Sequence, residues 1–211
     1  MSIDKIFVNI LNNILVTLLI VSFVFFTSCR KSKDRVELVP EEFKAWVCFQ
    51  KGSYWIYMSD KEQLVDSTVL YMDPIIHYHT MEGSNHEKIS IEKIYLRLSS
   101  GVLRGFSISP SECITDFFNF ASSTCLLSDI SLSSQHSLEG DFFLDTIYPS
   151  YIINDNEFTN VVETRFIPYA GSDTNHLSVT FFYAKNIGLI RYTLRSSDTV
   201  TWSLVRWNVN Q

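Results

Sequence analysis

The sequence predicts an all-β protein, an antiparallel meander that forms a curved open sheet or a barrel, with a short N-terminal helix. From residue 54 onward, aromatic and β-branched residues alternate with polar ones in short runs, which is the period of a strand that buries one face. Clusters rich in Gly, Ser, Asn and Asp separate the runs and favour turns. Because short turns join antiparallel neighbours, a meander follows, and a two-sheet sandwich is the alternative that the pattern leaves open.

A short helix is predicted before the first strand. Pro40 stands at its first position, where a missing N–H does no harm, and two glutamates follow at the positive end of the helix dipole. Phe43, Trp46 and Val47 share one face, and the helix ends before Gly52. We expect this helix to cover one face of the sheet or to close one end of it.

The alternating runs place the strands along the chain. Strands are predicted over Tyr54–Met58, Val65–Met72, Ile75–Thr80, Glu87–Leu98, Val102–Ile108, Phe142–Tyr148, Tyr151–Ile153, Phe158–Ile167, Leu177–Lys185, Leu189–Leu194 and Val200–Val209. Residues 110–139 interrupt this rhythm and are rich in Ser, which predicts a long loop or a small excursion with a helical turn over residues 116–120.

Residues 1–28 are predicted to be a lipoprotein signal peptide. An uncharged run from Ile14 to Phe26 is shorter than the ~20 residues of a membrane-spanning helix, and the small residues Thr27 and Ser28 follow it. Together with Cys29 they resemble the lipobox of bacterial lipoproteins, which implies that Cys29 carries the lipid on its sulfur and its freed amine. Two or three acyl chains hold a protein firmly at a membrane. A retained single-span anchor is the alternative.

Residues 29–39 are predicted to be a lipidated basic tether, and residues 40–211 a single β domain. Directly after Cys29, residues 30–35 hold four basic residues against one acidic residue, so the tether should lie against anionic headgroups. The chain as a whole has a net charge of -6, which argues against nucleic acid as a partner. An aspartate directly after Cys29 would resemble the signal for inner-membrane retention in enteric bacteria, and the sequence has Arg30 there instead. We expect export to the outer membrane, with the protein facing the periplasm rather than the cell surface.

Two segments near the ends of the domain resemble small uncharacterised Bacteroidota-type lipoproteins. The first is residues 48–57, followed by Asp66 and Ser67, and the second is residues 182–190, followed by residues 202–205. The resemblance implies an exported all-β domain and no established activity. It therefore concerns the structure and location of the protein and adds nothing about chemistry.

Three cysteines remain beyond the lipidated one. Cys113 and Cys125 could pair across a short loop in an oxidising compartment, and such a disulfide would contribute ~3 kcal/mol in the chain-entropy model. The sequence leaves this pairing open, because it does not show whether the two Cβ atoms approach. Cys48 has apolar neighbours and is predicted to be a small buried hydrophobic residue rather than a reactive thiol.

Three histidines are weak candidates for a metal site. On a strand, His77 and His79 would point to one face, and His86 across the following turn could complete a three-nitrogen zinc site. The simpler explanation is that they are solvated polar residues of a hairpin. We therefore expect neither a metal nor any other cofactor.

The common enzyme signatures, among them Gly-x-Ser-x-Gly and the phosphate loop, are absent, so we expect no catalysis. The predicted function is a non-catalytic binding or accessory module of the cell envelope. Its N-terminal lipid would hold it at the membrane, and its partner would be an envelope protein, a glycan or a lipid ligand. One alternative is a lipid or lipoprotein carrier with a hydrophobic concavity, since Gly52 and Trp55 also resemble the start of lipocalins. Another is a metal-dependent hydrolase that uses His77, His79 and His86.

Aromatic residues are frequent on the predicted strands. About half of them should form core, and the others could form a stacking platform. These residues are Trp55, Tyr57, Tyr71, Tyr78, Tyr183, Tyr192, Trp202 and Trp207.

Overall fold

The computed structural model describes residues 34–61, 63–83, 87–117, 123–127, 134–136, 140–168 and 178–211. Contacts divide the chain into two compact units. The larger unit comprises residues 36–81 and 89–211 and holds the sheet and its core. In the smaller unit, residues 1–35 and 82–88, the Gly83 amide donates a hydrogen bond to the Glu87 carbonyl at 2.7 Å. The predicted signal peptide and Cys29 lie outside the described residues.

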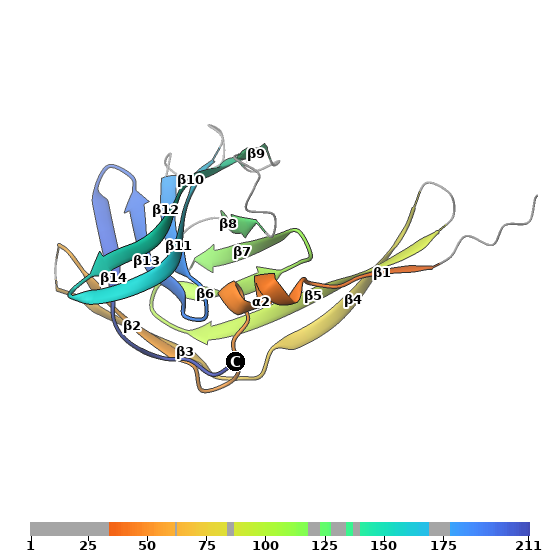
Figure 1. The fold of residues 1–211 in the computed structure, drawn as a ribbon, viewed down its shortest axis with the longest axis horizontal. Helices are drawn as coiled ribbons and strands as arrows, with labels where there is room; N and C mark the ends of the chain where they lie inside the picture. The colour runs from red at the N-terminus through yellow and green to blue at the C-terminus, as the bar shows by residue number, and fades with distance from the viewer. Residues whose placement is uncertain are drawn as a thin grey trace, which may run out of the picture. The chain divides into compact units, whose positions relative to one another are not determined.

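An antiparallel sheet and one short helix make up the described structure, which confirms the all-β prediction (Figure 1). The elements are β1 (Arg35–Glu37), α2 (Glu41–Val47), β2 (Tyr54–Ser59), β3 (Val65–Leu70), β4 (Ile75–Glu82), β5 (Lys88–Ser99), β6 (Leu103–Ile108), β7 (Glu112–Phe117), β8 (Ser123–Leu127), β9 (Ser134–His136), β10 (Gly140–Ile153), β11 (Asn156–Pro168), β12 (Ser178–Ala184), β13 (Gly188–Arg195) and β14 (Thr199–Asn208). No described helix is both long enough and apolar enough to span a bilayer.

Most neighbours in the sheet are also neighbours in the sequence, as a meander requires. The strand order is β8-β7-β6-β5-β3-β2-β14-β13-β12-β11-β10-β9, and β1 and β4 pair with β5 beside this path. Three pairings are exceptions: β3 pairs with β5, β1 pairs with β5, and β2 pairs with β14. The last of these joins the beginning of the described sheet to its end. Beyond the ends of β2 and β14, the Asn210 amide donates to the Ser53 hydroxyl at 2.9 Å. The two ends of the domain therefore stabilise each other.

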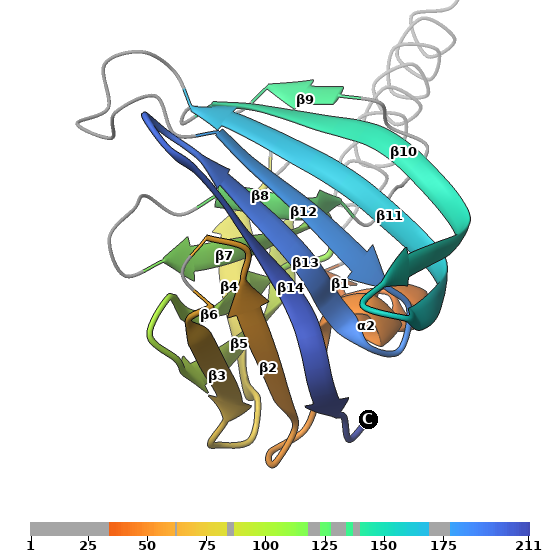
Figure 2. The same ribbon diagram turned by 90° about the vertical axis from the view of Figure 1, so that its left-hand side faces the viewer.

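The sheet curves strongly, so that β8 comes into contact with β11 (Figures 1 and 2). At this contact the Thr164 hydroxyl donates a buried hydrogen bond to the Cys125 carbonyl at 2.6 Å. The curvature brings the inward faces of distant strands together, and their apolar side chains form one hydrophobic core. This arrangement is nearly a closed barrel, within the range of the predicted open sheet or barrel.

Helix α2 packs against β13 and begins one residue later than predicted (Figure 2). Pro40 is its N-cap residue rather than its first helical residue, and the Pro40 carbonyl accepts hydrogen bonds from the amides of Phe43 and Lys44. Phe43 and Val47 are buried, as their shared face predicts. The chain before the helix also belongs to the fold. Val39 is buried, and its amide donates to the Glu92 carboxylate at 2.7 Å.

The prediction of a loop over residues 110–139 was wrong for the described part of this segment, because it contains β7, β8 and β9. The predicted helical turn over 116–120 was wrong at residues 116 and 117, which end β7, while 118–120 lie outside the described residues. Polar side chains hid the alternation here, since Thr115 is fully buried beside Cys113. The two predicted strands on either side of Pro149 are one strand, β10, whose ladder with β11 continues on both sides of this proline.

Candidate functional site

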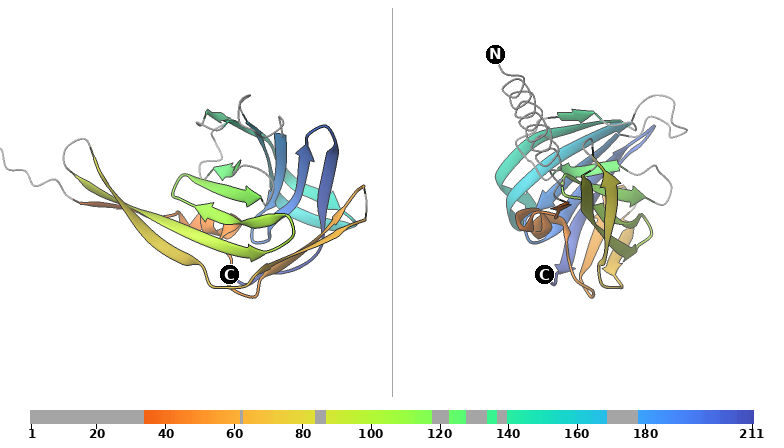
Figure 3. Two further views of the ribbon diagram at one scale, coloured as in Figure 1. Left: turned by 180° about the vertical axis from the view of Figure 1, so that it is seen from behind. Right: turned by 90° about the vertical axis from the view of Figure 1, so that its right-hand side faces the viewer.

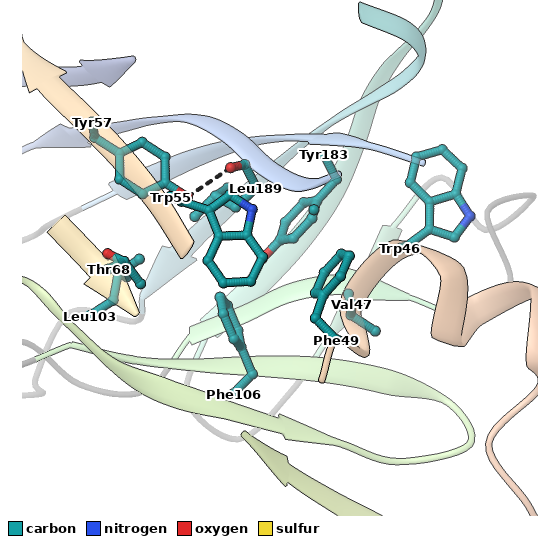
Figure 4. A pocket seen from close by; sticks show the side chains of 11 residues that line it. Trp46, Val47, Phe49, Trp55, Tyr57, Thr68, Leu103, Phe106, Tyr183 and Leu189 are labelled. Carbon is teal, nitrogen blue, oxygen red and sulfur yellow. Dashed lines mark hydrogen bonds between the residues drawn. The ribbon is translucent and has the colours of Figure 1, made fainter. Parts of the chain in front are cut away.

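The interior of the sheet is filled by aromatic side chains rather than open to a ligand. Figure 4 shows Phe49, Trp55 and Phe106 directed toward one another, with Tyr57 beside them. The space that remains among them is about 10 Å³, which is the volume that one water molecule needs. This space among the described aromatic side chains is too small for a lipid tail.

Hydrogen bonds from the aromatic side chains fix this interior. The Tyr57 hydroxyl donates to the Leu189 carbonyl at 2.7 Å, and the Trp55 indole donates to the Ile187 carbonyl at 2.6 Å. Burial raises the pKa of Tyr57 well above its usual value, and the Asp66 carboxylate raises it further. These groups therefore remain neutral and serve the packing of the core. Residues 48–57 and 182–190, which are far apart in the sequence, meet at this place.

A large hollow lies over β4, β5 and β6, and we call it the basic groove. Its volume is about 560 Å³, within the range of ~300–1,000 Å³ that is usual for small-molecule sites. The three strands that form it lie side by side in Figure 3. The groove is lined by Tyr71, Ile75, His77, Tyr95, Leu96, Arg97, Leu98, Arg104, Gly105 and Phe106.

Strand alternation explains how β5 contributes to the basic groove. Ile94, Leu96 and Leu98 are buried, so Tyr95 and Arg97 lie on the opposite face of the strand. The His77 ring of β4 meets the edge of the Tyr95 ring, with the centroids 5.8 Å apart and the planes at 72°. Such an edge-to-face contact restrains the tyrosine ring and leaves part of it exposed to a ligand.

A glycine keeps β6 close to β5 in the groove. Gly105 lies opposite Arg97 in the ladder, and a Cβ atom at Gly105 would be 2.3 Å from the Leu96 carbonyl oxygen. A side chain at this position would overlap with β5, so the ladder position opposite Arg97 carries none. The turn before β6 is also fixed, because the Asp66 carboxylate accepts hydrogen bonds from the Ser100 hydroxyl at 2.6 Å and the Gly101 amide at 2.8 Å.

The electrostatic character of the basic groove differs from that of the whole chain. Arg97 and Arg104 line the groove, and none of the described lining residues is acidic. The chain as a whole has a net charge of -6. A localised positive potential on an otherwise acidic protein attracts an anionic ligand.

A second hollow of about 540 Å³ lies beside α2, but its charges already serve the fold. Lys44 forms an ion pair with Glu41 at 2.8 Å and approaches Glu92 at 3.8 Å. The hydrogen bond to Glu41 is the main reason why the pKa of Lys44 is raised. The Cys48 thiol also lines this hollow, and burial raises its pKa, which disfavours the reactive thiolate. The basic groove is therefore the better candidate.

The histidines predicted as metal candidates are only partly described. His77 and His79 lie two residues apart on β4 and are both exposed, as the simpler explanation requires. His86 lies outside the described residues, so the three-nitrogen site stays a prediction. Among the described residues no group of three or more metal-binding side chains occurs.

The structure brings Cys113 and Cys125 together on neighbouring strands. Both are fully buried free thiols, and the Cys125 sulfur lies 3.1 Å from the Cys113 carbonyl oxygen. Burial raises the pKa of Cys113 well above its usual value, and the contact with the Cys125 thiol adds to this. Their predicted pairing stays a prediction.

The aromatic residues divide between core and surface. Trp55, Tyr57, Tyr183, Tyr192 and Trp202 are buried, Trp207 is half-buried, and Tyr71 and Tyr78 are exposed.

The sequence pattern did not single out Tyr95 and Arg97 as candidate binding residues. The alternation from Ile94 to Leu98 contained the necessary information, because it places a tyrosine and an arginine on the same exposed face. A comparison with protein-family models found no match, and a comparison with curated proteins found no similar sequence.

Proposed function

We propose that this protein is a lipid-anchored binding module of the bacterial envelope, without catalytic activity, and that the basic groove is its ligand surface. The observation that carries the proposal is the pairing of a filled interior with a groove of about 560 Å³ on the sheet surface. Tyrosine faces and guanidinium groups line this groove. Such groups bind and orient a ligand through stacking and charge-assisted hydrogen bonds.

The anchor is proposed from the sequence alone. In this proposal Cys29 carries the lipid, residues beyond it form the basic tether, and the domain faces the periplasm from the outer membrane. The larger unit begins at residue 36, so few residues separate it from Cys29 in the sequence. A short tether keeps the domain, and hence the basic groove, close to the membrane.

The carrier alternative receives little support from the geometry. A lipid carrier needs an enclosed apolar cavity of several hundred Å³, whereas the space among the core aromatics is about 10 Å³. The hydrolase alternative depends on His86, which lies outside the described residues. A surface binding module requires neither feature.

The anchor can be tested by cell fractionation. The full-length chain and its Cys29→Ala variant would be expressed in a Gram-negative host, and Ser28→Ala, which keeps a small residue at the cleavage point, would be the control. We expect the wild-type chain and Ser28→Ala in the outer-membrane fraction and Cys29→Ala outside it. Unchanged membrane association of Cys29→Ala would contradict lipid anchoring.

The location of the binding surface can be tested by hydrogen exchange of the full-length protein. Backbone amides would be followed with and without a detergent extract of the host envelope. We expect slower exchange in β5 and β6 and unchanged exchange in the β10–β11 hairpin. Protection confined to other strands, or no protection with any extract, would remove the basic groove as the binding surface.

A further inference from the structure

We propose that the ligand of the basic groove is an acidic oligosaccharide, whose sugar rings stack on Tyr71 and Tyr95 and whose carboxylates pair with Arg97. This inference rests on the proposed function and names the chemical class of its ligand.

The rings point to a carbohydrate. Tyr71 is 49% exposed, and the Tyr95 ring is restrained by the edge of the His77 ring. A tyrosine that is held in place by a neighbouring ring offers a flat apolar face with little loss of side-chain entropy, and the C–H face of a sugar ring complements such a surface. The polar rim of arginine and histidine side chains suits the hydroxyl groups at the edge of the sugar. It does not suit an alkyl chain.

The charge points to an acid. Arg97 is exposed, and no ion pair joins it to an acidic side chain in the part of the chain that the structure describes. Its guanidinium can therefore engage a carboxylate through two parallel hydrogen bonds without first breaking an internal contact. Arg104 lines the same groove. In a chain with a net charge of -6, this local charge is most simply explained by an anionic ligand.

The glycine in the groove makes room for this ligand. Gly105 lies opposite Arg97, and no side chain fits there, so the guanidinium can lie along β6 instead of being pushed outward. A carboxylate that binds Arg97 then lies close to the faces of the neighbouring rings. Stacking and charge thus act on adjacent parts of one extended, polar ligand.

The test is a calorimetric titration of the full-length lipoprotein in neutral detergent with trigalacturonic acid, and with galactotriose as the uncharged counterpart. We expect at least about tenfold tighter binding of the acid, because a charge-assisted hydrogen bond is lost with the neutral sugar. Arg97→Gln should weaken binding of the acid by about tenfold. Arg97→Lys should weaken it by less, since lysine keeps the positive charge but cannot donate two parallel hydrogen bonds as a guanidinium does. Tyr95→Ala should weaken binding of both sugars, and Tyr95→Phe should not.

Arg206→Gln is the matched control, because Arg206 is an exposed arginine on β14, outside the basic groove, and its loss should leave binding unchanged. Equal binding of the two sugars, or full affinity in Arg97→Gln, would overturn the acidic class of the ligand. Equal binding of a triaspartate peptide would overturn its carbohydrate nature. If none of the probes binds while envelope extract still slows exchange in β5 and β6, this inference fails and the proposed function stands.

Discussion

Gly105 shows how one residue controls the spacing of two strands. Its missing side chain lets β6 approach β5 so closely that a Cβ atom would be 2.3 Å from the Leu96 carbonyl oxygen. We predict that Gly105→Ala lowers the free energy of unfolding by about 1–3 kcal/mol, because the backbone must move to remove this overlap. Urea unfolding would measure the loss. Ser107→Ala, two residues along the same strand, is the control and should stay within about 0.5 kcal/mol of the wild type.

Cys113 and Cys125 give a second prediction at the scale of single residues. The Cys125 sulfur lies 3.1 Å from the Cys113 carbonyl oxygen on the neighbouring strand, so the fold holds the two cysteines near each other. Because burial raises the pKa of Cys113, the folded thiol is a poor nucleophile. We therefore expect the pair to oxidise during folding and to resist oxidation once β7 and β8 have closed.

The measurement is refolding of the reduced chain in a glutathione redox buffer, followed by alkylation after denaturation and mass spectrometry. We expect Cys113 and Cys125 to be protected from alkylation, with the two thiol hydrogens and two electrons transferred to oxidised glutathione. Cys48→Ala retains this pair and should give the same result. Alkylation of both cysteines after refolding would show that they remain thiols.

At the scale of the elements, the turn between β10 and β11 is the clearest case in which the local sequence sets the structure. Ile153 pairs with Asn156, so Asn154 and Asp155 form a two-residue connection, and both have left-handed backbone angles, with φ of 47° and 62°. A type I′ turn needs this geometry, and it prefers Gly at its second position.

We predict that Asp155→Gly raises the free energy of unfolding by about 0.5–1 kcal/mol, since glycine adopts the left-handed region without strain. Asp155→Val should lower it by about 1 kcal/mol or more, because a β-branched residue fits this region poorly. Thermal or urea unfolding would measure both variants. Asp198→Gly, in the β13–β14 turn, is the control, as Asp198 has no positive φ and should gain nothing. A gain of the same size in both turns would contradict this explanation.

The elements were predictable from the sequence where one face is apolar and the other polar. β2, β5, β11 and β14 follow this pattern closely. β7 and β8 do not, because Thr115 and two cysteines occupy positions on their buried side, and burial of these small residues depends on the contact with β11. The basic groove was predictable only in part. Tyr71 and His77 were identified, but the approach of Gly105 to Leu96 is a contact between strands that no local pattern reveals.

At the scale of the whole molecule, long-range pairing of the sheet decides the structure. β2 and β14 pair although they lie near opposite ends of the described sequence. β8 meets β11 through the hydrogen bond between the Thr164 hydroxyl and the Cys125 carbonyl. Such contacts between distant segments make folding slow relative to a helical protein of the same size. They also bury polar groups deeply, because the two halves of the sheet close over them.

The buried tyrosines make the free energy of unfolding of the whole molecule fall as the pH rises in the alkaline range. Burial raises the pKa of Tyr57, Tyr183 and Tyr192 above the usual value of about 10, so these phenols stay protonated in the folded state after they ionise in the unfolded one. Their contribution is fully present below about pH 10, and it is lost as the pH rises from there through the folded pKa values. Each phenol lowers the free energy of unfolding by up to about 1.4 kcal/mol per pH unit in this window.

We predict that the free energy of unfolding falls steeply between about pH 10 and pH 11. The three phenols together contribute a slope of up to about 4 kcal/mol per pH unit. Urea unfolding at a series of pH values, with tyrosinate absorbance as a second probe, would measure it. Tyr57→Phe should reduce the slope by about one third, although it also loses the hydrogen bond to Leu189. Tyr71→Phe removes an exposed phenol and should leave the slope unchanged. A slope that is the same in Tyr57→Phe as in the wild type would mean that Tyr57 ionises without unfolding, and that the core around β2 and β13 admits water.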